Sequence, residues 1–268
     1  MTLTQSDKAQ KFLALHQTNR PLVLVNAWDV ASARIVEEQG FPAIATTSAG
    51  IAWAQGYADG ERISRDEMLG CVERIVRTVG VPVTADLEGG YGTTVKDAVA
   101  TAQGVIEIGA VGLNFEDTSG SSAGLLDADL QVSRIKAIRE VATKHGMPLV
   151  INARTDVYLA HIGDNDAWRL QEACRRGNLY LQAGADVAFV PGVTDEKIIT
   201  ALVSGIEGPL NVLAAASTPS IERLRQLGVA RVSLGSGAMG YILARLRDIA
   251  KSLREGGSFE FVGQRISH

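Results

Sequence analysis

The chain has few cysteines, no long apolar run and no apolar leader, and each shortage removes a class of protein. Its two cysteines, Cys71 and Cys174, lie 103 positions apart, which fits neither a zinc-binding pattern nor a disulfide framework. No run of ~18 apolar residues is present to cross a bilayer. The segment from Met1 to Lys11 is polar and lacks the apolar centre of a signal peptide. We therefore expect a cytoplasmic protein without a membrane partner.

A strong charge of one sign is also missing. The formal net charge is −4, and the lysines and arginines form no block along the chain. Proteins that bind nucleic acid or anionic membrane surfaces need a basic patch, so we expect neither partner here. Hydrophobic residues make up 46% of the 268 residues, which is enough to build a large core.

Short apolar segments alternate with segments of helical spacing eight times, after an amphipathic opening at Ser6–Gln17. The expected strands are Leu22–Asn26, Ala43–Thr46, Val81–Ala85, Val111–Phe115, Leu149–Ala153, Val187–Val190, Leu210–Ala214 and Arg231–Leu234. The expected helices are Asp29–Gln39, Arg65–Val79, Thr94–Ile108, Ala128–Lys144, Asp166–Ala183, Asp195–Val203, Ser220–Gln226 and Ala238–Glu255, with a loop at Ser48–Ser64. Eight such units predict a (β/α)₈ TIM barrel that occupies residues 1–268 as one domain. A Rossmann fold is the rival, but no G-x-G-x-x-G follows a strand.

Three of the expected strands end in two polar residues spaced i, i+2. These pairs are Asp86 with Glu88, Asn114 with Glu116, and Asn152 with Arg154. Residues i and i+2 of a strand face the same side, and barrel enzymes place their sites where the strands end. The spacing therefore predicts one cluster of three carboxylates, two amides and a guanidinium.

Histidine and lysine are absent from the expected strand ends. The four histidines and seven lysines fall on helices, in loops or near the chain ends. A Schiff-base mechanism needs a lysine in the site, and zinc prefers His or Cys ligands, so both are disfavoured. Oxygen ligands alone suit Mg²⁺ or Mn²⁺. Without such a cation, the acids would have to form structural ion pairs with Arg154, and one guanidinium leaves carboxylate charge uncompensated.

The remaining polar residues near the strand ends indicate the substrate. Arg154 can grip a carboxylate in a bidentate manner, and the small residues Thr47, Ser48 and Ala49 let backbone N–H groups approach an oxyanion. Together with the cation they suggest a small 2-oxo acid. For Asp156, a role as a cap or salt-bridge partner is a better interpretation than a role as a metal ligand. Gly235-Ser236-Gly237 is compatible with a phosphate cradle, but a tight turn is the stronger interpretation.

At these residues the chain resembles the isocitrate lyase / phosphoenolpyruvate mutase superfamily. The resemblance spans residues 20–240, and the matching segments follow the order of the family. They are Asn26-Ala27-Trp28-Asp29, Thr47-Ser48-Ala49-Gly50, Gly56-Tyr57-Ala58-Asp59-Gly60, Asp86-Leu87-Glu88-Gly89-Gly90-Tyr91-Gly92, Asn114-Phe115-Glu116-Asp117 and Asn152-Ala153-Arg154-Thr155-Asp156.

The resemblance implies a barrel whose last helix is exchanged between subunits, usually in a homotetramer. It also implies Mg²⁺ at Asp86, with Asp59, Glu88 and Glu116 completing the metal shell mostly through water. Arg154 would hold the substrate carboxylate, and the backbone at Ser48 and Ala49 would meet its other oxygen atoms. Members of the family make or break C–C or P–C bonds next to a 2-oxo acid, through an enolpyruvate-like intermediate.

The loop after the fourth expected strand departs from the family. Lyases of the family carry Lys-x-Cys-Gly-His there, and the mutases and phosphonopyruvate hydrolases carry Lys and Asn. In this chain the segment from Asp117 to Leu126 has no Cys, His, Lys or Asn. Pro191-Gly192 also stands where the family often has Pro-Glu-Gly.

These departures leave the bond that reacts open. We expect C–C cleavage in which an oxaloacetate-like 2-oxo acid loses CO₂ or an acyl unit to give an enolate, because it needs only enolate stabilisation and a proton that water can supply. P–C chemistry on phosphonopyruvate is the alternative within enzymes. A non-catalytic 2-oxo-acid-binding protein is the alternative of another class.

Overall fold

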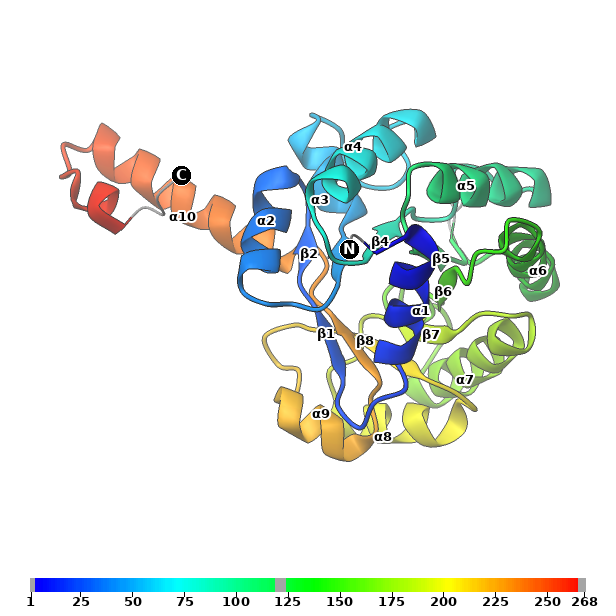
Figure 1. Cartoon of the computed structure of the whole chain (residues 1–268). Coiled ribbons are helices and arrows are strands. Elements are labelled where there is room, and N and C mark those ends of the chain that lie inside the picture. Colours follow the sequence, from blue (N-terminus) through cyan, green and yellow to red (C-terminus); the bar gives the residue numbers. More distant parts are fainter. Residues whose placement is uncertain (1–2, 119–123, 265–268) are drawn as a thin grey trace.

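The strands of the chain form one parallel sheet that closes on itself almost completely. The computed structural model describes residues 3–118 and 124–264. Its strands are β1 (Leu22–Leu24), β2 (Asn26–Ala27), β3 (Ile44–Thr46), β4 (Val83–Asp86), β5 (Gly112–Glu116), β6 (Val150–Arg154), β7 (Val187–Val190), β8 (Leu210–Leu213) and β9 (Arg231–Ser233). They pair in the order β1-β9-β8-β7-β6-β5-β4-β3-β2 (Figure 1). β1 and β2 are separated only by Val25, so they act as one interrupted first strand, and the predicted (β/α)₈ barrel is confirmed.

The helices surround the sheet. They are α1 (Gln5–Leu15), α2 (Val30–Glu38), α3 (Ser48–Ala54), α4 (Arg65–Thr78), α5 (Val95–Glu107), α6 (Ala128–Lys144), α7 (Asp166–Gln182), α8 (Glu196–Gly205), α9 (Ile221–Leu227), α10 (Gly237–Arg254) and the 3₁₀ turn η1 (Glu260–Gln264). The eight expected helices are all present, with no end shifted by more than two residues.

The first part of the expected loop at Ser48–Ser64 is wrong, because Ser48–Ala54 form α3. Thr47 begins this helix by accepting a hydrogen bond from the Gly50 N–H at 3.4 Å. The helix then buries Ile51 and Ala52 against the core. A seven-residue helix shows less than two full turns of periodicity, so its pattern is too short to stand out from a loop.

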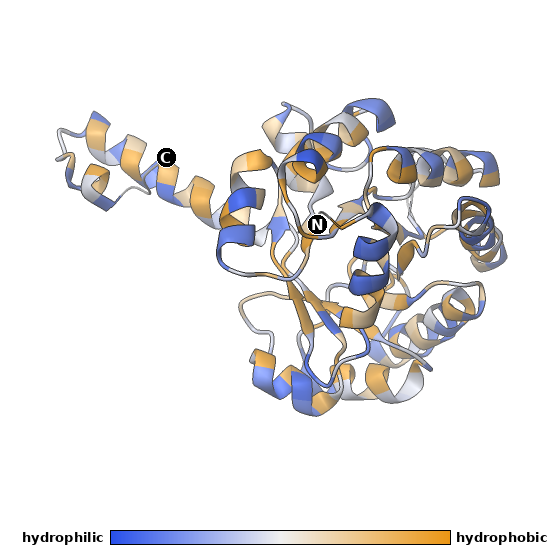
Figure 2. Ribbon diagram, in the orientation of Figure 1, coloured by the Kyte–Doolittle hydropathy of each residue, from blue (hydrophilic) through white to orange (hydrophobic). Residues whose placement is uncertain are grey.

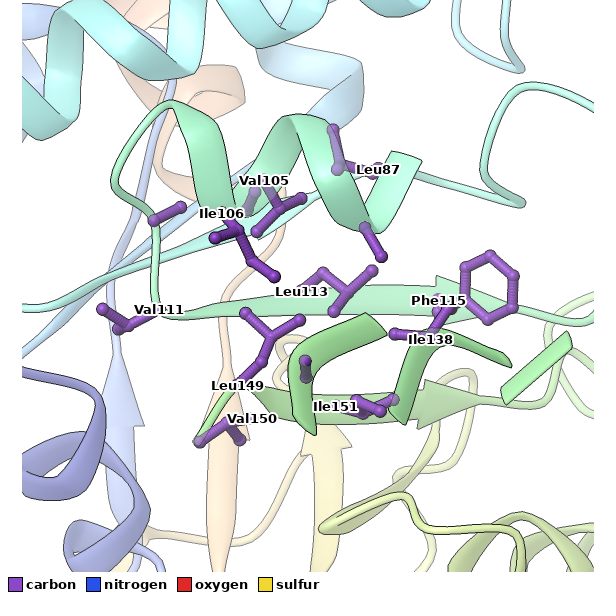
Figure 3. Close-up of a cluster of buried hydrophobic side chains, with 14 of the residues drawn as sticks. Leu87, Val105, Ile106, Val111, Leu113, Phe115, Ile138, Leu149, Val150 and Ile151 are labelled. Atoms are coloured by element: carbon purple, nitrogen blue, oxygen red, sulfur yellow. The ribbon is translucent and has the colours of Figure 1, made fainter. Parts of the chain in front are cut away.

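Apolar side chains fill the space between the sheet and the helices. Figure 2 shows hydrophobic residues concentrated along the strands and on the helix faces turned toward them. In the part of the core drawn in Figure 3, Leu113 of β5 lies between α5 and α6, close to Val105 and Ile138. The strands are apolar on both faces because helices cover the outside and side chains fill the inside.

Helix α1 lies across the amino ends of the strands. Its Gln5 side chain donates to the carbonyl oxygen of Ala110, just before β5, at 2.9 Å. Phe12 and His16 are buried there, and the guanidinium of Arg231 lies 6.0 Å from the Phe12 ring. Burial and the charge of Arg231 lower the pKa of His16 to about 4, so it is neutral near pH 7. The end opposite the polar strand ends is therefore closed by packing.

The last helix, α10, projects away from the barrel (Figure 1). Its apolar residues Tyr241, Ile242 and Leu246 are 67%, 51% and 58% exposed. Within the described residues, no helix is both long and apolar enough to cross a bilayer.

Candidate metal-dependent active site

Neighbouring strands bring the predicted polar residues together at two successive positions along the barrel axis. In the sheet register, Asp86 of β4 pairs with Asn114 of β5, and Asn114 pairs with Asn152 of β6. One level further on, Glu116 of β5 pairs with Arg154 of β6. The i, i+2 argument is therefore confirmed for β5 and β6, and the carboxyl ends of three adjacent strands meet at one place.

Asp86 and Glu88 do not share one face of strand β4 as the i, i+2 spacing predicts, although the two carboxylates still lie close together. The strand ends at Asp86, and Glu88 lies in a turn with φ of 51°. Glu88 is still close enough to Asp86 and Asp59 for their charges to raise its pKa. A turn in the left-handed region, and not strand alternation, directs this side chain.

A cavity of about 170 Å³ opens beside these strand ends. It is lined by Asn26, Thr47, Ser48, Ala49, Asp59, Asp86, Asn114, Arg154, Leu159, Phe189, Leu213, Ser233, Gly235 and Ser236. Six of the predicted site residues are therefore in the lining, while Glu88 and Glu116 lie beside it. Arg154 is the one basic residue among these lining residues.

Asp86 is held by the start of α3. Its Oδ2 accepts hydrogen bonds from the Ser48 N–H at 3.0 Å and the Ser48 hydroxyl at 2.9 Å. Its Oδ1 is buried and has no hydrogen-bond partner within the described residues. Ser48 therefore positions Asp86 in this structure, instead of offering its N–H to a substrate oxygen as expected. Thr47 caps α3, and the Ala49 N–H in the first turn is the backbone donor that fits the expected role.

Glu88 shows the same combination of one held and one unsatisfied oxygen. Its Oε2 accepts a hydrogen bond of 2.6 Å from the Glu61 N–H, and its buried Oε1 has no partner in the described part of the chain. Burial, followed by the charges of Asp86 and Asp59, raises the pKa of Glu88 to about 8. Partial burial of its carboxyl group and the charge of Asp86 also raise the pKa of Asp59, an otherwise exposed residue at the rim.

Arg154 is clamped by two carboxylates. Its Nε and Nη2 donate to Asp156 at 2.5 and 2.9 Å, and its Nη1 lies 2.8 Å from Glu116 Oε2. Burial alone would lower the pKa of Arg154, but Glu116 and Asp156 raise it overall, so the guanidinium stays charged. These contacts use three of its five N–H donors, which leaves two for a ligand. The salt-bridge role predicted for Asp156 is confirmed.

Glu116 is tied to its neighbours more firmly than expected. Besides Arg154, it accepts a hydrogen bond of 2.8 Å from the Thr118 hydroxyl. Burial raises the pKa of Glu116 well above its ordinary value, although Arg154 opposes the shift. Across residues 3–118 and 124–264, no group of three His, Cys, Asp or Glu side chains is arranged to hold a metal ion by itself. The structure therefore does not bring Glu116 together with Asp86 and Glu88 as direct ligands.

The residues nevertheless fit a hard cation that keeps part of its water shell. Asp86 and Glu88 each have one unsatisfied buried oxygen, and unpaired carboxylate oxygens are costly to bury. Mg²⁺ commonly binds through one or two carboxylates and retains several waters. Asp86 and Glu88 supply suitable oxygens, with Asp59 within electrostatic reach at the rim.

Several supporting residues gave no signal in the sequence. Asp117 accepts hydrogen bonds from the Asp156 N–H at 3.0 Å, from Arg176 at 3.1 Å and from the Tyr180 hydroxyl at 2.7 Å. This network holds the backbone of Asp156 beneath Arg154. Arg176 and Tyr180 lie on α7, about sixty residues away, so no local pattern links them to the site. The loop after β5 continues from here, and residues 119–123 lie outside the described residues.

The asparagines near the strand ends bond to other protein groups. The Asn152 amide donates to Asn114 Oδ1 at 2.7 Å, and the same oxygen accepts from the buried guanidinium of Arg231 at 3.3 Å. Asn26 Oδ1 accepts from the N–H groups of Leu234 and Gly235 at 2.9 Å, which fixes the turn before α10.

Comparison with known proteins agrees with this geometry. Residues 12–254 match the family model described as phosphoenolpyruvate phosphomutase. An uncharacterised protein of Mycobacterium tuberculosis is 34% identical over 245 residues, covering 91% of this chain and 89% of the relative. The 2-methylisocitrate lyase of Escherichia coli is 26% identical over 270 residues, covering 96% and 88%.

Solved structures also resemble this chain in fold. A Burkholderia cenocepacia J2315 protein, described provisionally as a phosphonomutase, superposes with a TM-score of 0.87. It is 40% identical, and the match covers 91% of this chain and 99% of that chain. The chain therefore belongs to the phosphoenolpyruvate phosphomutase family, within the phosphoenolpyruvate mutase/isocitrate lyase superfamily of lyases and mutases.

Proposed function

We propose that the chain is an enzyme that depends on Mg²⁺ or Mn²⁺ and cleaves a C–C bond of a small 2-oxo acid. The observation that carries the proposal is the pair of unsatisfied carboxylate oxygens on Asp86 and Glu88, beside a cavity that also exposes Arg154. Buried carboxylate oxygens that have neither a hydrogen bond nor an ion pair, at the mouth of a barrel, fit a bound cation better than a structural role.

Each side chain of the site has a defined task in this proposal. Asp86 and Glu88 hold the cation, with Asp59 and Glu116 contributing through water. When bound, the cation supplies positive charge next to the oxygen that becomes an enolate. Arg154 uses its two remaining N–H donors to hold the carboxylate next to the keto group, and the Ala49 N–H faces another substrate oxygen.

The rest of the cavity wall favours loss of CO₂. Leu159, Phe189 and Leu213 are apolar lining residues, and Arg154 is the one basic residue in the lining. Arg231 is buried behind the lining, where it donates to Asn114 at 3.3 Å. In oxaloacetate, breaking the C3–C4 bond releases CO₂, leaves its electron pair in the enolate and requires one proton at C3. A carboxylate that leaves as CO₂ loses its charge, so apolar surroundings do not oppose its departure. Water is the proton source.

Phosphonopyruvate is the second candidate within enzyme chemistry. Family relatives act on both kinds of bond, according to their names. A phosphonyl group keeps its negative charge and would need cationic partners, yet Arg154 is already shared by Glu116 and Asp156. The remaining alternative is a protein that binds 2-oxo acids without turning them over.

Turnover of oxaloacetate tests the proposal. We expect Mg²⁺-dependent pyruvate formation above the rate of the metal alone, abolished by Asp86→Ala and retained by Asp129→Ala, an exposed acid on α6. If phosphonopyruvate reacts instead, the P–C alternative replaces ours. If neither phosphonopyruvate nor any 2-oxo diacid reacts while pyruvate still binds, the non-catalytic alternative stands.

We also propose that α10 exchanges between subunits of a homotetramer. Support comes from its position away from the barrel and from the exposed apolar side chains of Tyr241, Ile242 and Leu246. Sedimentation should show an oligomer that dissociates in Leu246→Glu. A monomeric native chain at micromolar concentration would contradict this assembly.

A further inference from the structure

The acids of the site lie on separate segments, and something must hold these segments in register. Asp86 ends β4, Glu88 lies in the turn that follows, and Glu116 ends β5. The turn is conformationally demanding, because Glu88 and Tyr91 have φ of 51° and 59° and the glycines Gly90 and Gly92 also have positive φ. Non-glycine residues hold such a conformation only where the surroundings enforce it.

Arg134 of α6 holds the turn in this conformation through hydrogen bonds to its backbone. Its guanidinium is fully buried, and its Nη2 donates to the carbonyl oxygens of Gly89 and, at 2.7 Å, of Gly92. These two carbonyls stand on either side of Gly90 and Tyr91, and Gly89 directly follows Glu88. The guanidinium also lies 4.5 Å from the ring of Phe115, the residue before Glu116. One side chain therefore fixes the turn that begins immediately after Glu88.

Gln131, one helical turn earlier on α6, extends the contact to β5. Its Oε1 accepts from Arg134 Nη1 at 2.8 Å, and its Nε2 donates to the Glu116 carbonyl at 3.0 Å. The Arg134–Gln131 pair thus joins the backbone of the Glu88 turn to the backbone of Glu116.

The Asp59 loop is attached to the same turn by a reciprocal contact. The Glu61 N–H donates to the Glu88 carboxylate at 2.6 Å, and the Tyr91 N–H donates to the Glu61 carboxylate at 2.7 Å. Movement of the turn would therefore displace Glu88 and loosen the loop that carries Asp59.

We propose that Arg134 is a positioning residue for the cation site: through the Gly89 and Gly92 carbonyls and through Gln131, it fixes the spacing of Glu88 and Glu116. The inference rests on the proposed function, because it concerns the cation that those acids bind. Arg134 lies behind the backbone and does not line the cavity, so it acts on the ligand only through the acids.

The test compares two arginines of α6. Arg134→Lys keeps the charge but loses the planar fork that reaches two carbonyls and Gln131. Arg139 is the matched control, because it also donates to backbone carbonyls, those of Gly184 and Leu149, and pairs with Asp186. Mn²⁺ binding is measured by titration calorimetry on the purified full chain, together with the thermal midpoint of each variant.

We expect Arg134→Lys to weaken Mn²⁺ binding by ~10- to 100-fold, the usual effect of removing support behind metal ligands. Arg139→Lys should lower the thermal midpoint while leaving Mn²⁺ affinity within about twofold of the native value. Gln131→Met, which removes the bond to the Glu116 carbonyl, should weaken Mn²⁺ binding in the same direction and serves if Arg134→Lys does not fold.

Two different failures are distinguishable. If the native chain binds Mn²⁺ and Arg134→Lys or Gln131→Met binds it as tightly, Arg134 is only structural and this inference is overturned while the proposed function stands. If Arg139→Lys weakens binding as much as Arg134→Lys, the effect is general destabilisation and the inference is again overturned. If the native chain binds no Mn²⁺, the proposed function and the inference fail together.

Discussion

Two sets of acids in this barrel differ in whether a guanidinium pairs with them. Buried Asp117 uses both carboxylate oxygens, accepting from Asp156, Arg176 and Tyr180. Half-buried Asp186 accepts through Oδ2 from Arg139 at 2.6 Å and from the Ile151 N–H at 2.8 Å. In both cases a guanidinium balances the charge of the carboxylate, which is how a fold makes a buried acid tolerable.

Asp86 and Glu88 have no guanidinium in direct contact within the described residues, although Arg154 and Arg231 are near enough to interact electrostatically with Asp86. Each has one buried oxygen without a partner in the described residues, and the charges around Glu88 are the further acids Asp86, Asp59 and Glu61. The difference separates acids that hold the fold together from acids that are arranged for a ligand. The following predictions, from the largest effect to the smallest, test that distinction.

The largest effect should follow from Asp86→Asn. This change removes the negative charge that the cation needs while keeping an acceptor for the Ser48 hydrogen bonds. We expect metal-dependent turnover to fall by more than ~100-fold, which exceeds the usual loss for a supporting residue, and the urea midpoint to stay the same or rise. Turnover at the native rate would show that Asp86 does not bind the cation.

Asp117→Ala should mainly lower the stability of the fold, in contrast to Asp86→Asn, which should mainly lower turnover. Arg176 would keep only Glu172 as a counter-charge, and Tyr180 and the Asp156 N–H would lose their acceptor. Breaking a buried pair of this kind costs about 3–5 kcal/mol of unfolding free energy. Urea unfolding monitored by circular dichroism gives this value. A stability equal to that of the native chain would remove the distinction between paired and unpaired acids.

Arg154→Ala should weaken substrate binding in a chain that still folds, although stability should fall because Glu116 and Asp156 lose their shared counter-charge. Losing charge-assisted hydrogen bonds to a carboxylate costs about 1.5–3 kcal/mol, which is roughly 10- to 150-fold in affinity. Calorimetric titration with pyruvate in the presence of Mg²⁺ measures the loss. If the variant unfolds instead, Arg154 belongs with the structural ion pairs.

The smallest effect is on the pH dependence of stability without metal. The folded chain keeps a proton on Glu88 up to a pKa of about 8, whereas the unfolded chain releases it near 4.5. The unfolded state then binds fewer protons, so stability falls as pH rises from 6.5 to 8, by about 1 kcal/mol per pH unit. Below pH 6.5, His16 adds the opposite slope, because its pKa is lowered on folding.

Thermal unfolding in a chelator, between pH 6.5 and 8, measures this slope. Glu88→Gln should flatten it, and added Mg²⁺ should reverse the loss of stability most strongly at pH 8. A native slope that is unchanged in Glu88→Gln would mean that another group carries the proton.

The sequence predicted the barrel and most of the site because both depend on local patterns. Apolar runs bounded by glycine identified the strands, and alternation placed Asn114 with Glu116 and Asn152 with Arg154. The alternation rule failed at Glu88, because the chain leaves the strand after Asp86 and a left-handed turn sets the direction of the side chain.

The supporting residues could not be predicted from local patterns. Arg134 contacts Gly89 across 45 residues and Arg176 contacts Asp117 across 59. On their helices these arginines resemble ordinary polar positions, and only the packing of α6 and α7 against the sheet turns them inward. Long-range contacts of this kind leave no periodic signal in the chain.

If the unpaired acids form a cation site, the metal-free chain should bind Mn²⁺ at pH 7, which calorimetric titration measures. We expect one binding event per chain, with proton release because Glu88 must ionise, and loss of binding in Asp86→Asn. The absence of binding in the native chain, or equal binding in the variant, would contradict a cation site at these acids.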